Sequence, residues 1–316
     1  MWHLRVFAAL WATVWIAFEL HAGQAAIDFD DVIRKTGPLS PEEERKSFHL
    51  PPGFEAQLVA SEPEINKPIN IAFDARGRLW VTSTVEYPFP AKEPEKARDC
   101  IKILSDFDSN GKARKVETFA EGLNIPIGVL PYGNGAIGHS IPFIYYFEDT
   151  TGAGKSDKRT VLLDRIGFQK DTHGMSGNFV RGFDGWIYAT HGFNNDSTIK
   201  ALDGSSIAVN SGNTYRFRPD GSHIEQFTWG QVNPFGLTFD PLGNLYSCDC
   251  HTRPIYQLMR TVGRVSSAPV LRSKTPPFNI RSGKKCTNSE RPSAVSFKPF
   301  VCHWLYPASA ASEPPY

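Results

Sequence analysis

One motif of this chain is clearest at residues 177–192, which read GNFVRGFDGWIYATHG. An apolar-rich run leads into an Asp-Gly turn and then into a second apolar-rich run, which is the pattern of a β-hairpin. Three more stretches repeat it: INIAFDARGRLWVTS (69–83), IGVLPYGNGAIGHS (127–140) and GLTFDPLGNLYSCD (236–249). Gly77, Gly135, Gly185 and Gly243 fall where the turns need a positive φ. The motif therefore occurs four times.

The spacing of the hairpins indicates the architecture. They begin at residues 69, 127, 177 and 236, so one repeat takes about 50–60 residues. Further strand-like runs lie between them, at residues 100–105, 116–120, 143–147, 160–163, 214–218 and 224–228. About four strands per repeat is typical of a β-propeller blade, and near-even spacing is harder to obtain from a sandwich. The sequence predicts an all-β fold, a β-propeller with four blades visible.

Composition and charge support a globular chain without a basic surface. Of its 316 residues, 41% are hydrophobic and 12% aromatic, which is enough to bury a core. The formal net charge is only +1, which argues against nucleic acid as the main partner. Ser40, Pro41 and the acids after them predict a short capped helix over residues 40–47.

The two ends of the chain differ from its middle. Residues 1–26 resemble a cleaved secretory signal, with Arg5, an apolar run at 6–18 and small residues at 22–26. A spanning helix needs about 20 apolar residues, so this run favours a cleaved signal over a permanent membrane anchor. We therefore expect a periplasmic or secreted protein whose membrane association, if it has any, comes from this segment. Residues 27–50 form a lead-in, residues 51–260 the propeller, and residues 261–316 an irregular or disordered tail. A change of reading frame near codon 261 would explain the tail and would mean that the propeller is truncated.

A propeller gathers particular loops at one face. The loops that enter the first strand of each blade and leave the second strand meet around the central channel, so polar residues far apart in sequence converge there. The opposite face receives the Asp-Gly turns, which are structural. The residues predicted to converge are His173, His191, Asn194, Asn195, Asp196, Asn233, Asp249 and His251.

Each candidate has a functional and a structural interpretation. His173 is a general base or a loop histidine that bonds a neighbouring carbonyl. His191 and His251 occupy matching places in two blades, either as metal ligands with Asp249 or as links between blades. Asn233 donates to a ligand, or it only fixes the turn before a proline.

Two familiar cofactor motifs are weak or absent in the sequence. Residues 148–157 loosely resemble a calcium loop but lack its full alternation and its final bidentate acid. No Cys-x-x-Cys-His occurs, so covalent haem is not predicted.

Residues 40–260 resemble a known family. The matching stretches are LPPGFEAQLVASEPEINKPINIAFDARGRLWV (50–81), IPIGVLPYGNGAI (125–137), DTHGMSGNFVRGFDGWIYATHGFNN (171–195) and VNPFGLTFDPLGNLYSCDCHTRPIYQLMR (232–260). They are similar to the membrane-bound dehydrogenase propeller domain of planctomycete and verrucomicrobial secreted proteins. That domain is more distantly similar to soluble quinoprotein glucose and sugar dehydrogenases, six-bladed propellers that bind pyrroloquinoline quinone (PQQ) and calcium.

The resemblance implies a site and a mechanism. His173 matches the catalytic base, which takes a proton from a substrate hydroxyl while hydride passes to the quinone. Asn233 matches a cofactor-contacting asparagine, although Val232 stands where the quinoproteins have an arginine just before it. We assign cofactor contacts to Asn233, His191 and Asn195, and a metal to Asp249 and His251.

These assignments predict an oxidoreductase that takes a sugar or an alcohol and passes electrons to a redox acceptor. Two alternatives stay open from the residues alone. One is a non-catalytic propeller that binds carbohydrate or protein. The other is a calcium-dependent hydrolase of the lactonase kind.

Overall fold

The structure is a computed structural model that describes residues 37–260. The chain divides into two compact units, Met1–Glu43 and Glu44–Tyr316. The predicted signal segment 1–26, residues 27–36 of the lead-in and the predicted tail 261–316 lie outside the described residues. Within residues 37–260, no helix has the length and apolarity that a membrane crossing requires.

A short helix, α3 (Pro41–Ser47), stands where the capping pattern predicts one. The Ser40 hydroxyl accepts the backbone N–H of Glu43 at 3.3 Å, and the Glu43 carboxylate accepts the backbone N–H of Ser40 at 2.8 Å. These reciprocal bonds form a capping box, which satisfies donors that an isolated helix end leaves open.

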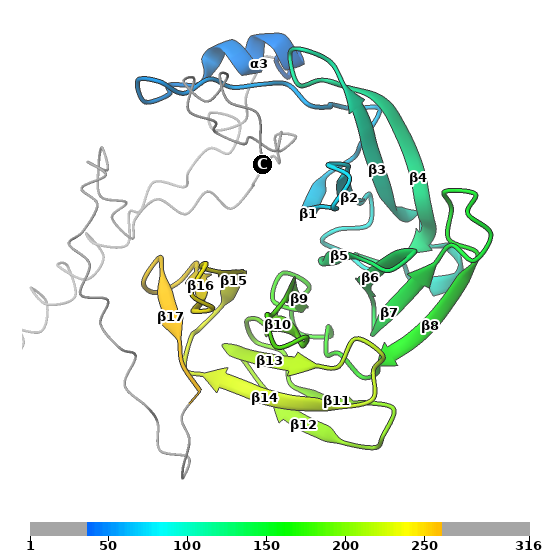
Figure 1. Ribbon diagram of the computed structural model, residues 1–316, viewed down its shortest axis with the longest axis vertical. Coiled ribbons are helices and arrows are strands. Elements are labelled where there is room, and N and C mark those ends of the chain that lie inside the picture. Colours follow the sequence, from blue (N-terminus) through cyan, green and yellow to red (C-terminus); the bar gives the residue numbers. More distant parts are fainter. Residues whose placement is uncertain (1–36, 261–316) are drawn as a thin grey trace, which may run out of the picture. The chain divides into compact units, whose positions relative to one another are not determined.

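Four sheets form four blades in a propeller arrangement, as the sequence predicts (Figure 1). The first blade has the order β1-β2-β3-β4, with the bounds Pro68–Phe73, Leu79–Ser83, Asp99–Phe107 and Ala113–Leu123. A 3₁₀ helix, η1 (Pro94–Lys96), lies in the connection between β2 and β3. The second blade has the order β5-β6-β7-β8, with the bounds Val129–Tyr132, Gly135–Ser140, Phe143–Glu148 and Lys158–Leu163.

The third and fourth blades are less regular. The third has the order β9-β10-β13-β14, with the bounds Ser176–Arg181, Ile187–His191, Asn213–Phe217 and Ile224–Trp229. A separate hairpin, β11 (Ser197–Lys200) and β12 (Ser206–Val209), is inserted between β10 and β13. The fourth sheet contains β15 (Pro234–Phe239), β16 (Leu245–Asp249) and β17 (Tyr256–Leu258).

All four predicted hairpins are confirmed, but one predicted turn glycine is wrong. Gly77, Gly185 and Gly243 have φ of 73°, 80° and 84°. In the second blade the positive φ belongs to Gly133, at 55°, and Gly135 instead begins strand β6. An added Cβ at Gly135 would lie 1.9 Å from the backbone oxygen of Phe147, so this glycine permits close strand packing rather than a turn.

The blades pack through their inner strands. β5 lies against β1 and β2, β9 lies against β5 and β6, and β15 lies against β9 and β10. One buried cluster joins the second and third blades, and it includes Ile137, Ile187 and Phe217. Because each inner strand contacts the next blade, the position of every loop depends on neighbours from other parts of the chain.

Strand direction separates the connections into two ends of the sheets. One end, which we call the loop face, carries residues 84–98, 124–128, 141–142, 164–175, 192–196, 210–212, 230–233 and 250–255. The other end, the turn face, carries the tight hairpin turns. A typical turn there is the one in which the Asp74 carboxylate accepts the backbone N–H groups of Arg76 and Arg78 at 2.9 and 3.0 Å. The predicted functional residues lie at the loop face.

Candidate functional site

His173 lies in the loop before β9 with its side chain about half exposed. Its Nδ1 is 2.8 Å from Oδ1 of Asp171, and that oxygen also accepts the backbone N–H of His173 at 2.7 Å. Because a carboxylate only accepts, Nδ1 is the nitrogen that donates. Nε2 therefore carries the lone pair of the neutral ring and can accept a proton.

Asn195 holds the backbone of the loop that carries Asp171 and His173. Its side chain is 1% exposed, and its Oδ1 accepts the backbone N–H groups of Lys170 and Asp171 at 3.2 and 3.3 Å. Its Nδ2 donates to the backbone oxygen of Asp171. Asn195, predicted as a cofactor contact, thus acts in the structure on the loop that carries His173.

The loop of the first blade reaches the same place. Tyr87 packs against the His173 ring in an edge arrangement, with 5.1 Å between centroids. The Thr172 hydroxyl donates to the backbone oxygen of Pro88 at 2.6 Å, and Lys67 Nζ donates to the backbone oxygen of Tyr87. Burial raises the pKa of Tyr87, and the charge of Asp171 raises it further. Tyr87 and Asp171 join His173 as candidate site residues.

Asp249 and Asn233 accept hydrogen bonds from backbone groups in a neighbouring part of the loop face. The Asp249 carboxylate accepts backbone N–H groups of Val232 and Asn233 at 2.8 and 3.1 Å, and those of His251 and Thr252 at 2.8 and 3.2 Å. Burial acts to raise the pKa of Asp249, but these donors outweigh it and hold the pKa below its ordinary value. The carboxylate is thus directed at backbone groups of two loops.

Asn233 and His251 both contact the loop after β10. Asn233 Oδ1 accepts the backbone N–H of Phe193 at 3.0 Å, and its Nδ2 lies 3.1 Å from Sγ of Cys250. The His251 ring stacks on Phe193 with 5.4 Å between centroids and 21° between planes. Its Nδ1 lies 3.0 Å from the Cys250 sulfur. Asn233 and His251 therefore converge, as predicted.

The residues around His173 and the residues around Asn233 and His251 meet at Gly174. An added Cβ at Gly174 would lie 2.2 Å from the backbone nitrogen of Phe193, so the His173 loop and the loop after β10 are in close contact. Asn194, also predicted to converge, lies in that second loop, where its backbone N–H donates to the Ser211 hydroxyl at 2.7 Å.

His191 lies apart from these groups, inside the third blade. Its Nδ1 donates to the backbone oxygen of Asn210 at 2.9 Å, so its Nε2 accepts the Ser197 hydroxyl at 2.7 Å. Burial lowers its pKa to about 4. Its partners are the first residue of β11 and the residue that follows β12, so His191 holds the inserted hairpin within the third blade and does not link two blades.

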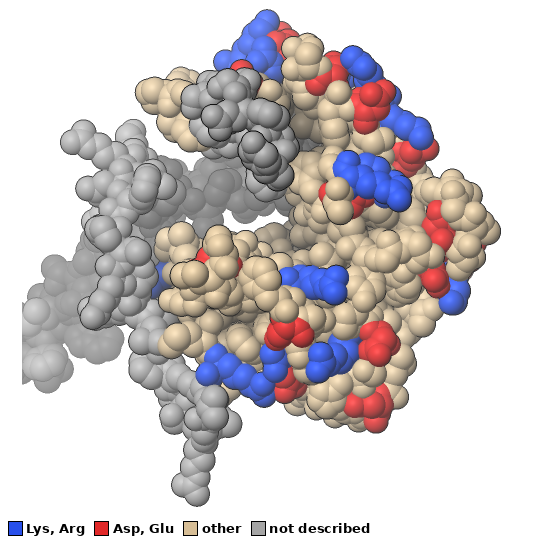
Figure 2. Space-filling model, viewed as in Figure 1, with Lys and Arg blue, Asp and Glu red and all other residues tan. Residues whose placement is uncertain are grey.

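The charged side chains near His173 already have partners. Lys170 Nζ lies 2.6 Å from Asp196 Oδ2, and Arg98 Nε lies 3.0 Å from Glu86 Oε1. Figure 2 shows most Lys and Arg patches next to Asp and Glu patches. Within residues 37–260, no group of three or more His, Cys, Asp or Glu side chains could hold a metal ion.

Asp171 and Tyr87 were missed by the sequence reasoning. An Asp two residues before a His is a local pattern, because the carboxylate commonly bonds the backbone two residues on, and it could have been found. Tyr87 gives no such signal, because it reaches His173 only through the packing of different blades.

Comparisons with solved structures give likenesses at low identity. The holo form of the pyranose dehydrogenase PQQ domain from Coprinopsis cinerea is 15% identical, covers 67% of this chain and 55% of that chain, and has a TM-score of 0.47. The AA12 carbohydrate-active enzyme from Trichoderma reesei is 13% identical, with coverages of 68% and 51% and a TM-score of 0.45. A gluconolactonase from Xanthomonas campestris is 16% identical, with coverages of 58% and 55% and a TM-score of 0.39.

The chain spans about half the length of these solved proteins. No curated protein matches it. A family model does match, over residues 40–295, and it therefore includes all four blades and the loop face. The chain belongs to the family described as a domain of unknown function, DUF7133.

Proposed function

We propose that this protein oxidises a hydroxyl group of a sugar or an alcohol, with His173 as the general base. The observation that carries the proposal is the pair formed by His173 and Asp171. An accessible imidazole whose Nδ1 donates to a largely buried carboxylate presents Nε2 to a substrate in the orientation that proton transfer needs.

His173 and Asp171 have different roles in the proton transfer. Nε2 of His173 takes the hydroxyl proton, and the Asp171 carboxylate stabilises the imidazolium that forms. Asn195 holds Asp171 through its backbone, and Tyr87 limits how far the ring can turn. Oxidation of the substrate also requires that a hydride leave the carbon and pass to a redox acceptor.

The described residues do not fit the cofactors that the family resemblance implies. PQQ carries three carboxylates, yet Val232 replaces the expected arginine and Lys170 is paired with Asp196. Lys67 is directed at backbone oxygens. No carboxylate cluster in residues 37–260 suits calcium. We therefore derive no step through the quinone, and PQQ with calcium stays a prediction of the resemblance.

The proposal is tested by dye reduction. The full chain is incubated with an artificial electron acceptor, with and without added PQQ and Ca²⁺, and reduction of the acceptor is followed with aldoses and primary alcohols. We expect turnover, and we expect His173→Ala to lower it by about 10²-fold or more, because general bases contribute on this scale.

A matched control exists on the turn face. His223 is also about half exposed, and its Nδ1 lies 2.7 Å from Asp203 Oδ2. His223→Ala should leave turnover unchanged. Unchanged turnover in His173→Ala, or no dye reduction by the wild-type chain with any substrate, would contradict the proposal.

Lactone hydrolysis is the second candidate, because the same pair can take a proton from water. Release of acid from gluconolactone measures it, with and without a chelator. Hydrolysis that is lost in His173→Ala and in chelator, without dye reduction, would favour the calcium-dependent lactonase. If the chain catalyses neither dye reduction nor lactone hydrolysis, the result would favour a propeller that only binds its ligand.

A further inference from the structure

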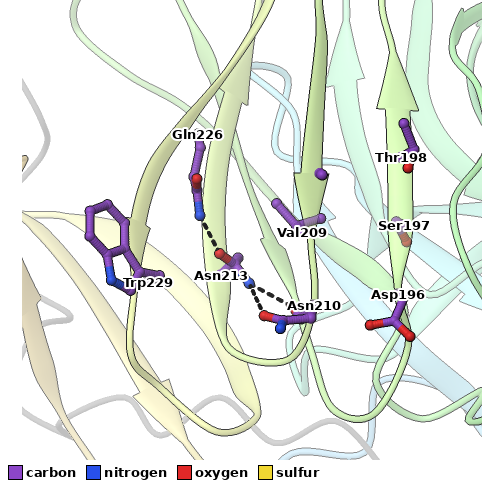
Figure 3. Close-up of a pocket in the computed structure, with 9 residues that line it drawn as sticks. Asp196, Ser197, Thr198, Val209, Asn210, Asn213, Gln226 and Trp229 are labelled. Carbon is purple, nitrogen blue, oxygen red and sulfur yellow. Dashed lines mark hydrogen bonds between the residues drawn. The ribbon is translucent and has the colours of Figure 1, made fainter. Parts of the chain in front are cut away.

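A pocket of about 530 Å³ lies beside the third blade. The inserted β11–β12 hairpin forms one side, and strands β13 and β14 form the other (Figure 3). Asn210, Asn213 and Gln226 lie between Trp229 on one side and Asp196 and Thr198 on the other. The proposed mechanism uses none of these side chains.

Hydrogen bonds fix the amides between the two sides. Asn213 is 2% exposed, and its Nδ2 donates to the backbone oxygens of Asn210 and Ser211. Its Oδ1 accepts Nε2 of Gln226 (Figure 3). That bond uses the amide nitrogen of Gln226, and the amide oxygen of Gln226 makes no hydrogen bond among the described residues. An acceptor held in one orientation is therefore available to a ligand.

Trp229 supplies a flat apolar surface. Trp229 is the last residue of strand β14. It is 36% exposed, and its side chain lines the pocket. Its indole N–H has no acceptor within the part of the chain that the structure describes. An aromatic face with a polar edge contacts the C–H groups of a ligand and hydrogen-bonds its hydroxyls.

The pocket carries no unpaired charge among its lining residues. Asp196 is its one charged side chain, and Lys170 lies 2.6 Å from the carboxylate. The hydrogen bond from Lys170 lowers the pKa of Asp196, so the carboxylate stays ionised and paired. An anionic or cationic ligand would find no partner here, whereas a neutral ligand rich in hydroxyls would find several.

We propose that this pocket binds a neutral carbohydrate, as a mono- or disaccharide unit. A sugar ring has one face of C–H groups for Trp229, and its hydroxyls suit the amides of Gln226 and Asn210 and the hydroxyl of Thr198. The pocket volume lies within the range of small-molecule sites.

Lys170 of the His173 loop pairs with Asp196 at 2.6 Å, but no residue of that loop lines the pocket. Buried His191 stands behind it, bonded to the backbone oxygen of Asn210 and to the Ser197 hydroxyl. Sugar binding here does not require oxidation, so this inference does not depend on the function proposed for His173.

Saturation-transfer NMR tests the inference on the full chain. The probes are D-glucose, D-galactose, maltose and cellobiose, used in the His173→Ala variant so that turnover cannot consume them. We expect transfer to the ring C–H protons of at least one probe. Trp229→Ala should weaken its binding about tenfold, whereas Trp229→Phe should keep most of it. Gln226→Ala should weaken it severalfold.

Phe183→Ala is the matched control, because Phe183 is an exposed aromatic residue (77%) in a hairpin turn of the turn face. It should leave binding unchanged. Absence of transfer to all four probes, or unchanged affinity in Trp229→Ala, would overturn the inference. Binding that depends on Trp229 without dye reduction by the wild-type chain would support the pocket and contradict only the oxidoreductase proposal.

Discussion

The orientation of the His173 ring depends on one carboxylate oxygen. Asp171 Oδ1 accepts both the ring Nδ1–H and the backbone N–H of the same histidine. Because these two bonds span only two residues, the pair is a local structure. Its exposure to substrate depends on the surrounding loops.

Asp171→Asn should lower turnover while the fold is kept. An amide can accept the same hydrogen bonds but cannot stabilise an imidazolium, so we expect a loss of about 10²-fold in kcat. Dye reduction across a range of pH measures this loss, and thermal unfolding checks the fold. Asp203→Asn, which alters the equivalent pair at His223, should leave turnover unchanged. Equal turnover in Asp171→Asn and wild type would exclude the proposed role.

A second histidine should affect stability rather than chemistry. His139 is fully buried, its Nδ1 donates to the backbone oxygen of Ile125, and its Nε2 has no partner among the described residues. Burial lowers its pKa to about 4 from 6.5. The unfolded chain therefore binds a proton more readily, so the stability that neutral His139 contributes is complete above pH 6.5 and is lost as the pH falls toward 4.

His139→Asn should make the protein less sensitive to acid. The asparagine Nδ2 can donate to the same carbonyl but does not titrate, so the variant should lose less stability between pH 7 and pH 4.5. The difference is roughly 3 kcal/mol at its limit. Urea unfolding at both pH values measures it, with the exposed His49→Asn as control. The same acid sensitivity in His139→Asn and wild type would contradict this explanation.

At the scale of elements, the four main hairpins could be predicted from the sequence, whereas the inserted β11–β12 hairpin could not. Each hairpin is built from about fourteen neighbouring residues, so alternation and turn glycines predict it. Strands β11 and β12 were not predicted, because each has only four residues and their apolar pattern is short. Ile199 and Val209 still bury against the large core, which stabilises the hairpin and forms one side of the Trp229 pocket.

Gly174 permits two loops of the site to touch. A Cβ there would lie 2.2 Å from the backbone nitrogen and 2.5 Å from the backbone oxygen of Phe193. Gly174→Ala should push the loops apart, release the bond from Phe193 to Asn233 and misplace His173. We expect turnover to fall at least tenfold, whereas the midpoint of thermal unfolding should fall only slightly.

Dye reduction and thermal unfolding, measured together, separate these two effects. Gly37→Ala is the control, because a Cβ at Gly37 would meet nothing within 4 Å. Turnover that is unchanged in Gly174→Ala would show that the contact between the loops does not position His173.

At the scale of the molecule, the blades depend on one another for their cores. Phe179 of the third blade is 7% exposed, packs against the Phe217 ring at 6.2 Å and reaches Gly128 at the second blade. One hydrophobic cluster therefore belongs to both blades. Residues 44–260 should unfold cooperatively.

Phe179→Ala should destabilise both blades at once. Truncation of a buried phenylalanine costs about 3 kcal/mol, since apolar contacts are lost and a cavity remains. Urea unfolding followed by circular dichroism should show one transition at a lower midpoint. Leu242→Ala, at a position that is 88% exposed, should stay within about 0.5 kcal/mol of wild type. Two separate transitions in the Phe179 variant would contradict a shared core.

The sequence by itself determined the repeat, the strand content and the loops that carry polar residues, because alternation and turn chemistry act over a few neighbouring positions. It placed His173, Asn233 and His251 at one face through the known order of strands in a blade. Their hydrogen-bond partners were not readable in that way.

Only the tertiary structure decided what each of these side chains contacts. His191 bonds Asn210 and Ser197 at both nitrogens, and Asp249 accepts backbone donors from two loops, although both residues look like ligands in the sequence. Tyr87 meets His173 across 86 positions of the chain. Such contacts follow from the packing of inner strands of different blades, which no local pattern encodes.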